Sequence, residues 1–282
     1  MKWTPGTQND DVVDVRGSTG GGRGGAGTSV GIGSVVVLVG ALVLSRVLGV
    51  DLSGLFSGGG GGGSPPASAP SAEDKELVDK IKDVMKDVQT TWDAKFQEVG
   101  KSYHHAKLYI FNEAIDTKCG RSTSAIGPFY CPGDENAYID LSFYRDLRER
   151  FGAPGDFAQI YVLAHEIGHH VQNLLDAERE LKRAQPRESN NQHSVRIELQ
   201  ADCYAGVWGH EAKGRDRLEA GDLEEAITAA QAIGDDRLQK QSGRNVNPES
   251  FTHGTSAQRV AWFRRGFDTG KIASCDTFSG DI

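Results

Sequence analysis

The chain contains 282 residues, of which 38% are hydrophobic and 25% are charged, so it is long enough to build one sizeable core. Its formal net charge of −8, without any run rich in Lys and Arg, argues against binding to nucleic acid. More than half of its 36 glycines lie before residue 65, so the amino-terminal part differs in organisation from the rest.

The amino-terminal part contains a possible membrane segment. Residues 1–29 are polar and rich in glycine, and we expect them to be disordered because they cannot form a core. Residues 30–50 (VGIGSVVVLVGALVLSRVLGV) carry a single charge, Arg46, and this run predicts one transmembrane helix. A cleaved signal peptide is the alternative, but the apolar run is long, begins late and lacks a convincing small-x-small cleavage site before Asp51.

The charges around this run predict its orientation. Basic residues lie on its amino-terminal side and none occurs between Arg46 and Lys75, which favours a cytoplasmic N-terminus and an extracytoplasmic domain. Arg46 itself argues weakly for the reverse. Residues 51–72, rich in Gly, Pro and Ser, are expected to form a linker, and residues 73–282 to form the folded domain. The sequence therefore predicts a single-pass protein of the cell membrane.

The domain is expected to have an α+β fold that is richer in helix than in strand. Residues 73–99 place apolar side chains at steps of three and four, which predicts an amphipathic helix. The other expected elements are strands at 107–111 and 137–141 with a cysteine-containing loop between them, and helices at 142–151, from Asp156 as N-cap until Pro186, 194–212, 219–233 and 255–267. The last helix begins with a capping box formed by Thr255 and Gln258.

Four cysteines, an even number, accompany the export-type segment and favour disulfides. We expect Cys119 to pair with Cys131, because the glycines and the proline between them suit a closed loop, which leaves Cys203 for Cys275. Four reduced, buried cysteines in a cytosolic protein are the alternative. No C-x-x-C pair is present, which argues against a cysteine zinc site.

The central predicted helix contains the motif HEIGH at 165–169. On a helix His165 and His169 lie one turn apart, with about 6 Å between their Cβ atoms, and Glu166 lies beside them. The H-E-x-x-H pattern supplies two zinc ligands and a carboxylate that can take a proton from water, as in metalloproteases. His170 is displaced by one helical step and is not expected to be a ligand.

A catalytic zinc ion needs a third protein ligand. The metzincin continuation requires Gly and His where this chain has Gln172 and Leu175, and the inverted H-x-x-E-H order is absent. A glutamate on a later helix remains. Glu198 and Asp202 lie four residues apart among small and apolar residues, so we expect Glu198 to be the third ligand and Asp202 to accept a hydrogen bond that fixes the ring of His165. The alternative pairs Glu198 with an arginine on a solvated face.

Several motifs together resemble a known bacterial family. They are HEIGHHVQN (165–173), RIELQADCYAGVW (196–208), GPFYCP (127–132), YIDLSFY (138–144) and THGTSAQR (252–259). The chain resembles the putative neutral zinc metallopeptidases, which are membrane-tethered gluzincins. This resemblance implies a zincin-like fold, a Zn²⁺ ion with His165, His169 and Glu198 as ligands, and Glu166 as the catalytic base.

The expected function is hydrolysis of peptide bonds by a zinc-dependent endopeptidase held outside the membrane. A non-catalytic scaffold that keeps the fold is the alternative, and retention of Glu166 favours the enzyme. His253, in the turn before the last helix, is the expected donor to the oxyanion, although it fits a surface turn nearly as well. Tyr204 is the weaker alternative donor. Arg259 either pairs with a carboxylate near the site or covers a helix face.

Overall fold

The computed structural model describes residues 1–16, 71–243, 245–280 and 282. The predicted transmembrane helix at 30–50, and the predicted linker up to residue 70, lie outside the described residues. Within these four ranges, no helix combines the length and apolar character needed to span a bilayer.

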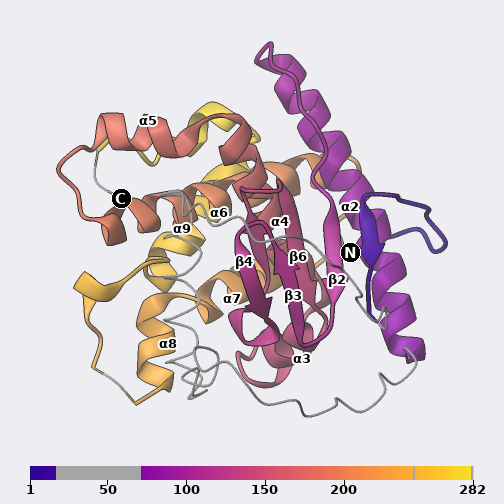
Figure 1. The fold of residues 1–282 in the computed structure, drawn as a ribbon. Coiled ribbons are helices and arrows are strands. Elements are labelled where there is room, and N and C mark those ends of the chain that lie inside the picture. Colours follow the sequence, from indigo (N-terminus) through magenta and orange to yellow (C-terminus); the bar gives the residue numbers. More distant parts are fainter. Residues whose placement is uncertain (17–70, 244, 281) are drawn as a thin grey trace.

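The fold is a helix-rich α+β arrangement, as predicted (Figure 1). The helices are α2 (Ala72–Glu98), α3 (Ser142–Glu149), α4 (Asp156–Leu174), α5 (Ala177–Ala184), α6 (Asn190–Gly214), α7 (Asp222–Ala232), α8 (Asp235–Gln241) and α9 (Ser256–Thr269). The strands are β1 (Val12–Asp14), β2 (Leu108–Phe111), β3 (Ala114–Thr117), β4 (Gly120–Thr123), β5 (Phe129–Cys131) and β6 (Asn136–Asp140). The predicted strands at 107–111 and 137–141 are present as β2 and β6.

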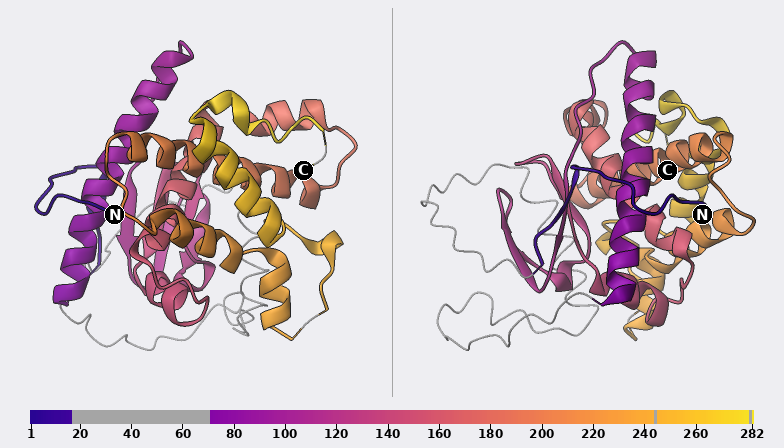
Figure 2. Two further views of the ribbon diagram at one scale, coloured as in Figure 1. Left: turned by 180° about the vertical axis from the view of Figure 1, so that it is seen from behind. Right: turned by 90° about the vertical axis from the view of Figure 1, so that its right-hand side faces the viewer.

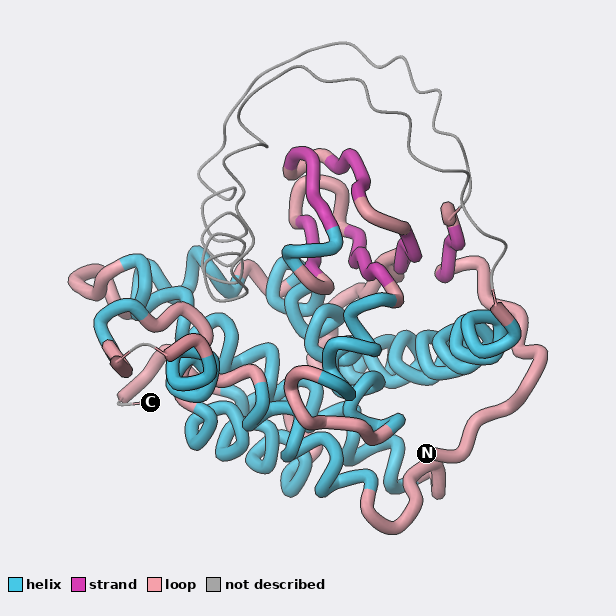
Figure 3. The backbone as a smooth tube through the Cα atoms, turned by 90° about the horizontal axis from the view of Figure 1, so that it is seen from below, coloured by secondary structure: helices cyan, strands magenta, loops and turns pink. Residues whose placement is uncertain are grey.

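The main sheet has the strand order β1-β2-β6-β5, and β3 and β4 form a separate hairpin. Strands β1, β2 and β6 are parallel, whereas β5 is antiparallel to β6. The strands lie together on one side of the molecule and most helices lie on the other (Figure 3). The long helix α2 runs beside the sheet (Figure 2), and its buried stripe joins a core that continues through α4, α6 and α9. The sheet therefore has a helical layer behind it, with α4 in the centre.

The central helix is shorter than predicted. It ends at Leu174 because Asp176 adopts the left-handed conformation with φ of 59°, and α5 begins at the next residue. The expected continuous helix to Pro186 is therefore wrong. Asp156 is the first helical residue and Gly155 is the N-cap, so the predicted cap is also displaced by one position.

Helix α6 begins earlier than predicted. Ser189 and Gln192 form a capping box, which starts the helix at Asn190, before the predicted start at residue 194. The predicted capping box of Thr255 and Gln258 is confirmed at the start of α9.

The expectation that residues 1–29 are disordered is wrong for residues 1–16. Strand β1 pairs in parallel with β2, and Val12 is only 8% exposed. The amide of Leu108 donates to Asp11 O at 2.7 Å, and the amide of Val15 donates to Ile110 O at 2.9 Å. The valines at 12, 13 and 15 explain this outcome, because they give the segment the β-branched residues typical of strands, which the glycine-rich residues after it lack.

Both predicted disulfides are present, Cys119–Cys131 and Cys203–Cys275. The first joins the β3–β4 turn to β5, a strand that lies within the predicted cysteine-containing loop. The second joins α6 to the segment after α9. Each bond therefore fixes an element that borders the site described next.

Candidate metal centre

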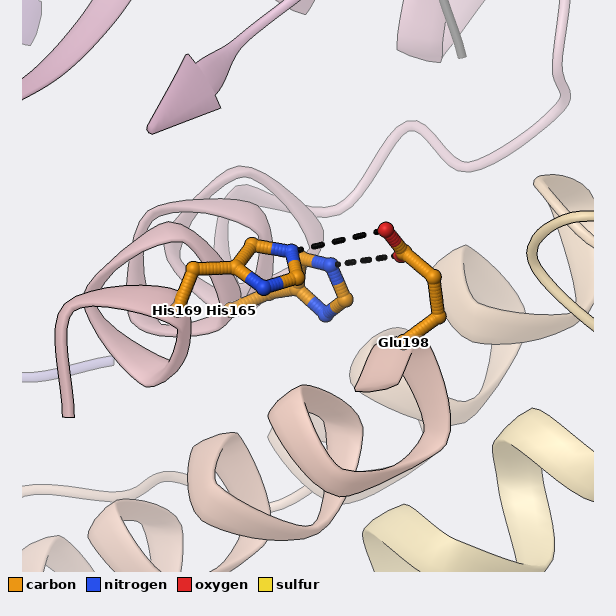
Figure 4. Close-up of side chains that lie close together, drawn as sticks. All are labelled: His165, His169 and Glu198. Atoms are coloured by element: carbon orange, nitrogen blue, oxygen red, sulfur yellow. Dashed lines mark hydrogen bonds and ion pairs between the residues drawn. The ribbon is translucent and has the colours of Figure 1, made fainter. Parts of the chain in front are cut away.

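Helices α4 and α6 approach each other closely at Gly168, inside the HEIGH motif. A Cβ atom on Gly168 would lie 2.9 Å from the carbonyl oxygen of Ala201, so any side chain would push the helices apart. Three residues before Ala201, Glu198 points from α6 toward the two histidines of α4 (Figure 4). The glycine thus permits the spacing on which the site depends.

His165, His169 and Glu198 meet at one point, as predicted. Their ligand atoms all lie within 4.8 Å of one another. The Nε2 atom of His165 is 3.1 Å from Glu198 Oε2, and the Nε2 atom of His169 is 3.6 Å from Glu198 Oε1. Two imidazole nitrogens and a carboxylate in this arrangement can hold one metal ion and leave a further coordination position open. The alternative, Glu198 paired with an arginine in solvent, is wrong.

The opposite ring nitrogens are held by hydrogen bonds. The Nδ1 atom of His165 lies 2.9 Å from Asp202 Oδ1, which is the partner that the sequence predicted. The Nδ1 atom of His169 lies 2.8 Å from Gln172 Oε1. Both contacts direct the Nε2 atoms toward Glu198. Gln172 was missed as a partner, although its position three residues after His169 places it on the same helix face.

The two histidines differ in their pKa values. Burial lowers the pKa of His165, but the carboxylates of Asp202 and Glu198 outweigh burial and raise it to about 10. Burial lowers the pKa of His169 to about 4. In the metal-free protein, a proton on His165 therefore balances the negative charge of the carboxylates, and His169 is neutral.

Asp202 is fully buried and belongs to a network with Arg259 and Tyr161. The Nε and Nη2 atoms of Arg259 donate to the two carboxylate oxygens at 2.8 and 2.9 Å, and the Tyr161 hydroxyl also donates. Burial acts to raise the pKa of Asp202, but Arg259 outweighs it and holds the pKa below its usual value. Of the two roles left open for Arg259, the structure therefore selects the carboxylate partner.

Arg259 reaches this network because α6 and α9 are in close contact. A Cβ on Gly206 would lie 2.1 Å from Phe263 O, and a Cβ on Gly266 would lie 1.9 Å from Cys203 O. These two glycines let the helix backbones meet directly. The contact brings a side chain of the last helix behind the HEIGH motif.

Glu166 is 8% exposed and lines the same cleft as the three candidate ligands. No side chain in the described ranges donates a hydrogen bond to its carboxylate. Burial raises its pKa to about 7. A carboxylate in this state can accept and release a proton near neutral pH.

His253 lines the same cleft as Glu166 and is held by Asp235. The Nδ1 atom of His253 is 3.1 Å from Asp235 Oδ1, and Asp235 Oδ2 accepts backbone N–H groups from Thr252, His253 and Gly254. No described residue is bonded to His253 Nε2. Burial lowers the pKa of His253, but the hydrogen bond to Asp235 and the nearby Glu198 raise it above its usual value. Asp235 was missed, because its distance of eighteen residues from His253 gives no periodic signal.

The cleft has a volume of about 580 Å³. Its apolar lining includes Phe129 on β5, Phe143 on α3 and Val162 on α4. Tyr204 is not among the lining residues; it is 3% exposed and packs edge-on against Trp92 at 5.5 Å. The weaker alternative for the oxyanion donor therefore does not reach the site.

His170 is completely buried, and it is not part of the cluster of ligand atoms, as predicted. Its Nδ1 atom is 3.0 Å from the Tyr130 hydroxyl, and its Nε2 atom is 2.7 Å from His104 O. The third histidine of the motif therefore joins α4 to β5, which forms one wall of the cleft.

Comparison with known proteins assigns the chain to a family. The model of the family "Putative neutral zinc metallopeptidase" matches residues 1–278. "Uncharacterized protein YpfJ" of Escherichia coli is 46% identical over 288 residues, which cover 100% of both chains. "Uncharacterized protein Mb2605" of Mycobacterium bovis is 44% identical over 199 residues, which cover 66% of this chain and 67% of the relative. No solved structure matches. The chain belongs to the putative neutral zinc metallopeptidase family.

Proposed function

We propose that this protein is a zinc-dependent endopeptidase with a zincin-like site of the gluzincin type. His165, His169 and Glu198 would hold the zinc ion, because two imidazole nitrogens and one carboxylate form a donor set typical of catalytic zinc. The observation that carries the proposal is Glu166, which is buried beside this set without a partner among the described side chains. A purely structural metal site needs the ligands but not this carboxylate.

The residues around the cleft divide the catalytic work. When bound, zinc would polarise the scissile carbonyl and make water more acidic. Glu166 takes the proton of the attacking water and later delivers it to the leaving amine. His253 donates a hydrogen bond from Nε2 to the developing oxyanion, and its raised pKa favours the cation that carries this proton. Asp235 keeps the ring in place.

The cleft suits an extended peptide as the substrate. Among the described strands, β5 is at the edge of the main sheet, and its residues Phe129 and Tyr130 line the cleft. A peptide can add to such an edge through main-chain hydrogen bonds, while the apolar lining receives its side chains. We further propose that the protein acts at the cell membrane, in an extracytoplasmic compartment. The two disulfides support the extracytoplasmic compartment, and the apolar composition of residues 30–50 supports association with a membrane.

The proposal is tested with the Glu166→Gln variant of the full-length chain, purified in detergent without chelator. We expect it to bind one zinc ion per chain, as the wild type does, and to lose at least about 1000-fold in peptide cleavage. Glu224→Gln, the same change at an exposed position on α7, is the matched control and should cleave normally.

The readouts are metal analysis and mass spectrometry of cleaved peptides. Equal cleavage by Glu166→Gln and the wild type would show that Glu166 is not the base. A wild type that holds zinc but cleaves no peptide under any condition would instead favour the non-catalytic scaffold.

A further inference from the structure

Residues 1–16, the amino-terminal segment, form an integral part of the metal-site domain. Strand β1 pairs with β2 in the register Val12↔Leu108, Val13↔Tyr109 and Asp14↔Ile110. Because β2 also pairs with β6, the segment extends the same sheet whose other edge, β5, borders the cleft. It is therefore continuous with the fold that builds the site.

Contacts along the whole segment hold it in this position. The amide of Lys2 donates to Arg217 O at 2.8 Å. The Thr7 hydroxyl donates to Asp83 at 2.9 Å, and the Asn9 side chain donates to Lys82 O at 3.0 Å; both partners are on α2. These contacts distribute the docking over three parts of the domain: β2, α2 and the segment after α6.

Asp11 adds a charged contact. His105 lies between two carboxylates, with Nδ1 2.8 Å from Asp11 Oδ2 and Nε2 3.0 Å from Asp93 Oδ2. At the end of the segment, Arg16 Nη1 is 3.7 Å from Asp74 Oδ2, in the first turn of α2. The two ends of the undescribed stretch 17–70 are therefore close together on one domain.

This proximity conflicts with a single crossing of the membrane. The apolar run at 30–50 has 21 residues, and a helix of that length is about 31 Å long, close to the hydrocarbon thickness of about 30 Å. If the run crossed once, residues 16 and 71 would emerge on opposite faces of the bilayer. Arg16 could not then contact Asp74 of its own chain, and β1 could not pair with β2.

We propose that the amino-terminal segment and the metal-site domain lie on the same side of the membrane. This arrangement replaces the expected topology in which the N-terminus is cytoplasmic and the domain is outside. It also means that residues 1–16 belong to the same folded unit as the chain from residue 71 onward. The proposal does not depend on catalysis.

The topology is tested by labelling single added cysteines with a membrane-impermeant maleimide. Gln8→Cys lies in the amino-terminal segment and Ala220→Cys lies before α7; both positions are exposed, and the described native cysteines are paired. Full-length variants are labelled in intact spheroplasts and again after permeabilisation. We expect both positions to be labelled under the same condition. Labelling of one position in intact spheroplasts and of the other only after permeabilisation would overturn the proposal.

Docking of the segment is tested independently by amide hydrogen exchange on the full-length chain in lipid nanodiscs. The Val15 amide, bonded to Ile110 O, should exchange at least tenfold more slowly than in a free peptide of residues 1–16. Equal rates would show that the segment is undocked at the membrane and would remove the basis of the proposal.

Discussion

His165 and His253 face the same cleft, and each places its Nδ1 atom against a buried aspartate, yet the two pairs are built differently. Asp202, which holds His165, is neutralised by the guanidinium of Arg259. Asp235, which holds His253, is anchored chiefly by backbone N–H groups. A side-chain cation stabilises one carboxylate, whereas fixed dipoles stabilise the other.

The two histidines also differ in the group that faces their other ring nitrogen, Nε2. The Nε2 atom of His165 faces Glu198 at 3.1 Å, whereas the Nε2 atom of His253 has no bonded partner among the described residues. The same histidine–aspartate pair therefore suits a metal ligand in one place and a hydrogen-bond donor in the other. The aspartate orients the ring, and the surroundings of the free nitrogen determine its chemical role.

Removing the first aspartate should have the largest effect. Asp202→Asn leaves the buried guanidinium of Arg259 without its charge partner, which should lower the free energy of unfolding by about 3 kcal/mol. It also weakens the orientation of His165, so zinc affinity should fall by about 10- to 100-fold. Chemical denaturation and competition with a zinc chelator measure the two effects. Unchanged zinc affinity would show that Asp202 does not position the ligand.

Changing the second histidine should affect catalysis alone. His253→Gln removes the cationic donor, and kcat should fall by about 100- to 1000-fold while zinc content stays at the wild-type level. Steady-state kinetics and metal analysis on the same preparation measure this. His210→Gln, at a position that is not among the residues lining the cleft, provides the control for a general effect of the substitution. Loss of zinc from His253→Gln would remove the distinction between the two histidines.

The second aspartate should have a smaller effect than the histidine it holds. In Asp235→Asn the amide can still accept the backbone N–H groups, but the charge that raises the pKa of His253 is gone. We expect kcat to fall by about tenfold and the alkaline limb of the pH–rate profile to move to lower pH. A fall in kcat with an unmoved alkaline limb would show that Asp235 does not act through the protonation of His253.

A third histidine, His105, is paired with carboxylates at the surface. Its substitution should have the smallest effect of all, a small change in the free energy of unfolding. Burial lowers its pKa, but Asp93 and Asp11 outweigh burial and raise it. Folding therefore favours the protonated ring; this stabilisation is complete below pH about 6.5 and is lost as pH rises through the folded pKa. Because His105 is 39% exposed, solvent screening should keep the contribution below about 1 kcal/mol.

The measurement compares denaturation midpoints of the wild type and His105→Gln at pH 6 and pH 9. The advantage of the wild type should be larger at pH 6 and should shrink in high salt. An advantage that grows toward pH 9 would contradict the assigned sign.

The sequence was sufficient to predict the site residues that lie one turn apart on the same helix. His165 and His169 are four residues apart, as are Glu198 and Asp202, so each pair could be placed on one face without knowledge of the fold. It was insufficient where partners come from different elements. Asp235 reaches His253 through the packing of α8 against the turn before α9, and this contact leaves no periodic pattern.

Two wrong predictions about secondary structure, the end of α4 and the disorder of residues 1–16, also have physical causes. Asp176 ends α4 by adopting a left-handed conformation, which Asp tolerates but does not signal as clearly as Gly or Pro. Strand β1 has only three residues, and its valines are outweighed by the composition of the glycine-rich residues that follow. Its stability comes from pairing with β2, nearly a hundred residues later in the chain.

The Cys203–Cys275 disulfide contributes to the stability of the native state in which the site is assembled. The bond closes a loop with a sequence separation of 72 residues, and this loop contains Asp235, His253 and Arg259. Closing a loop of that size removes conformational freedom from the unfolded chain and stabilises the native state by about 4 kcal/mol. In a reducing compartment this contribution would be absent, and the native state that holds these three residues beside the HEIGH motif would be less stable by that amount.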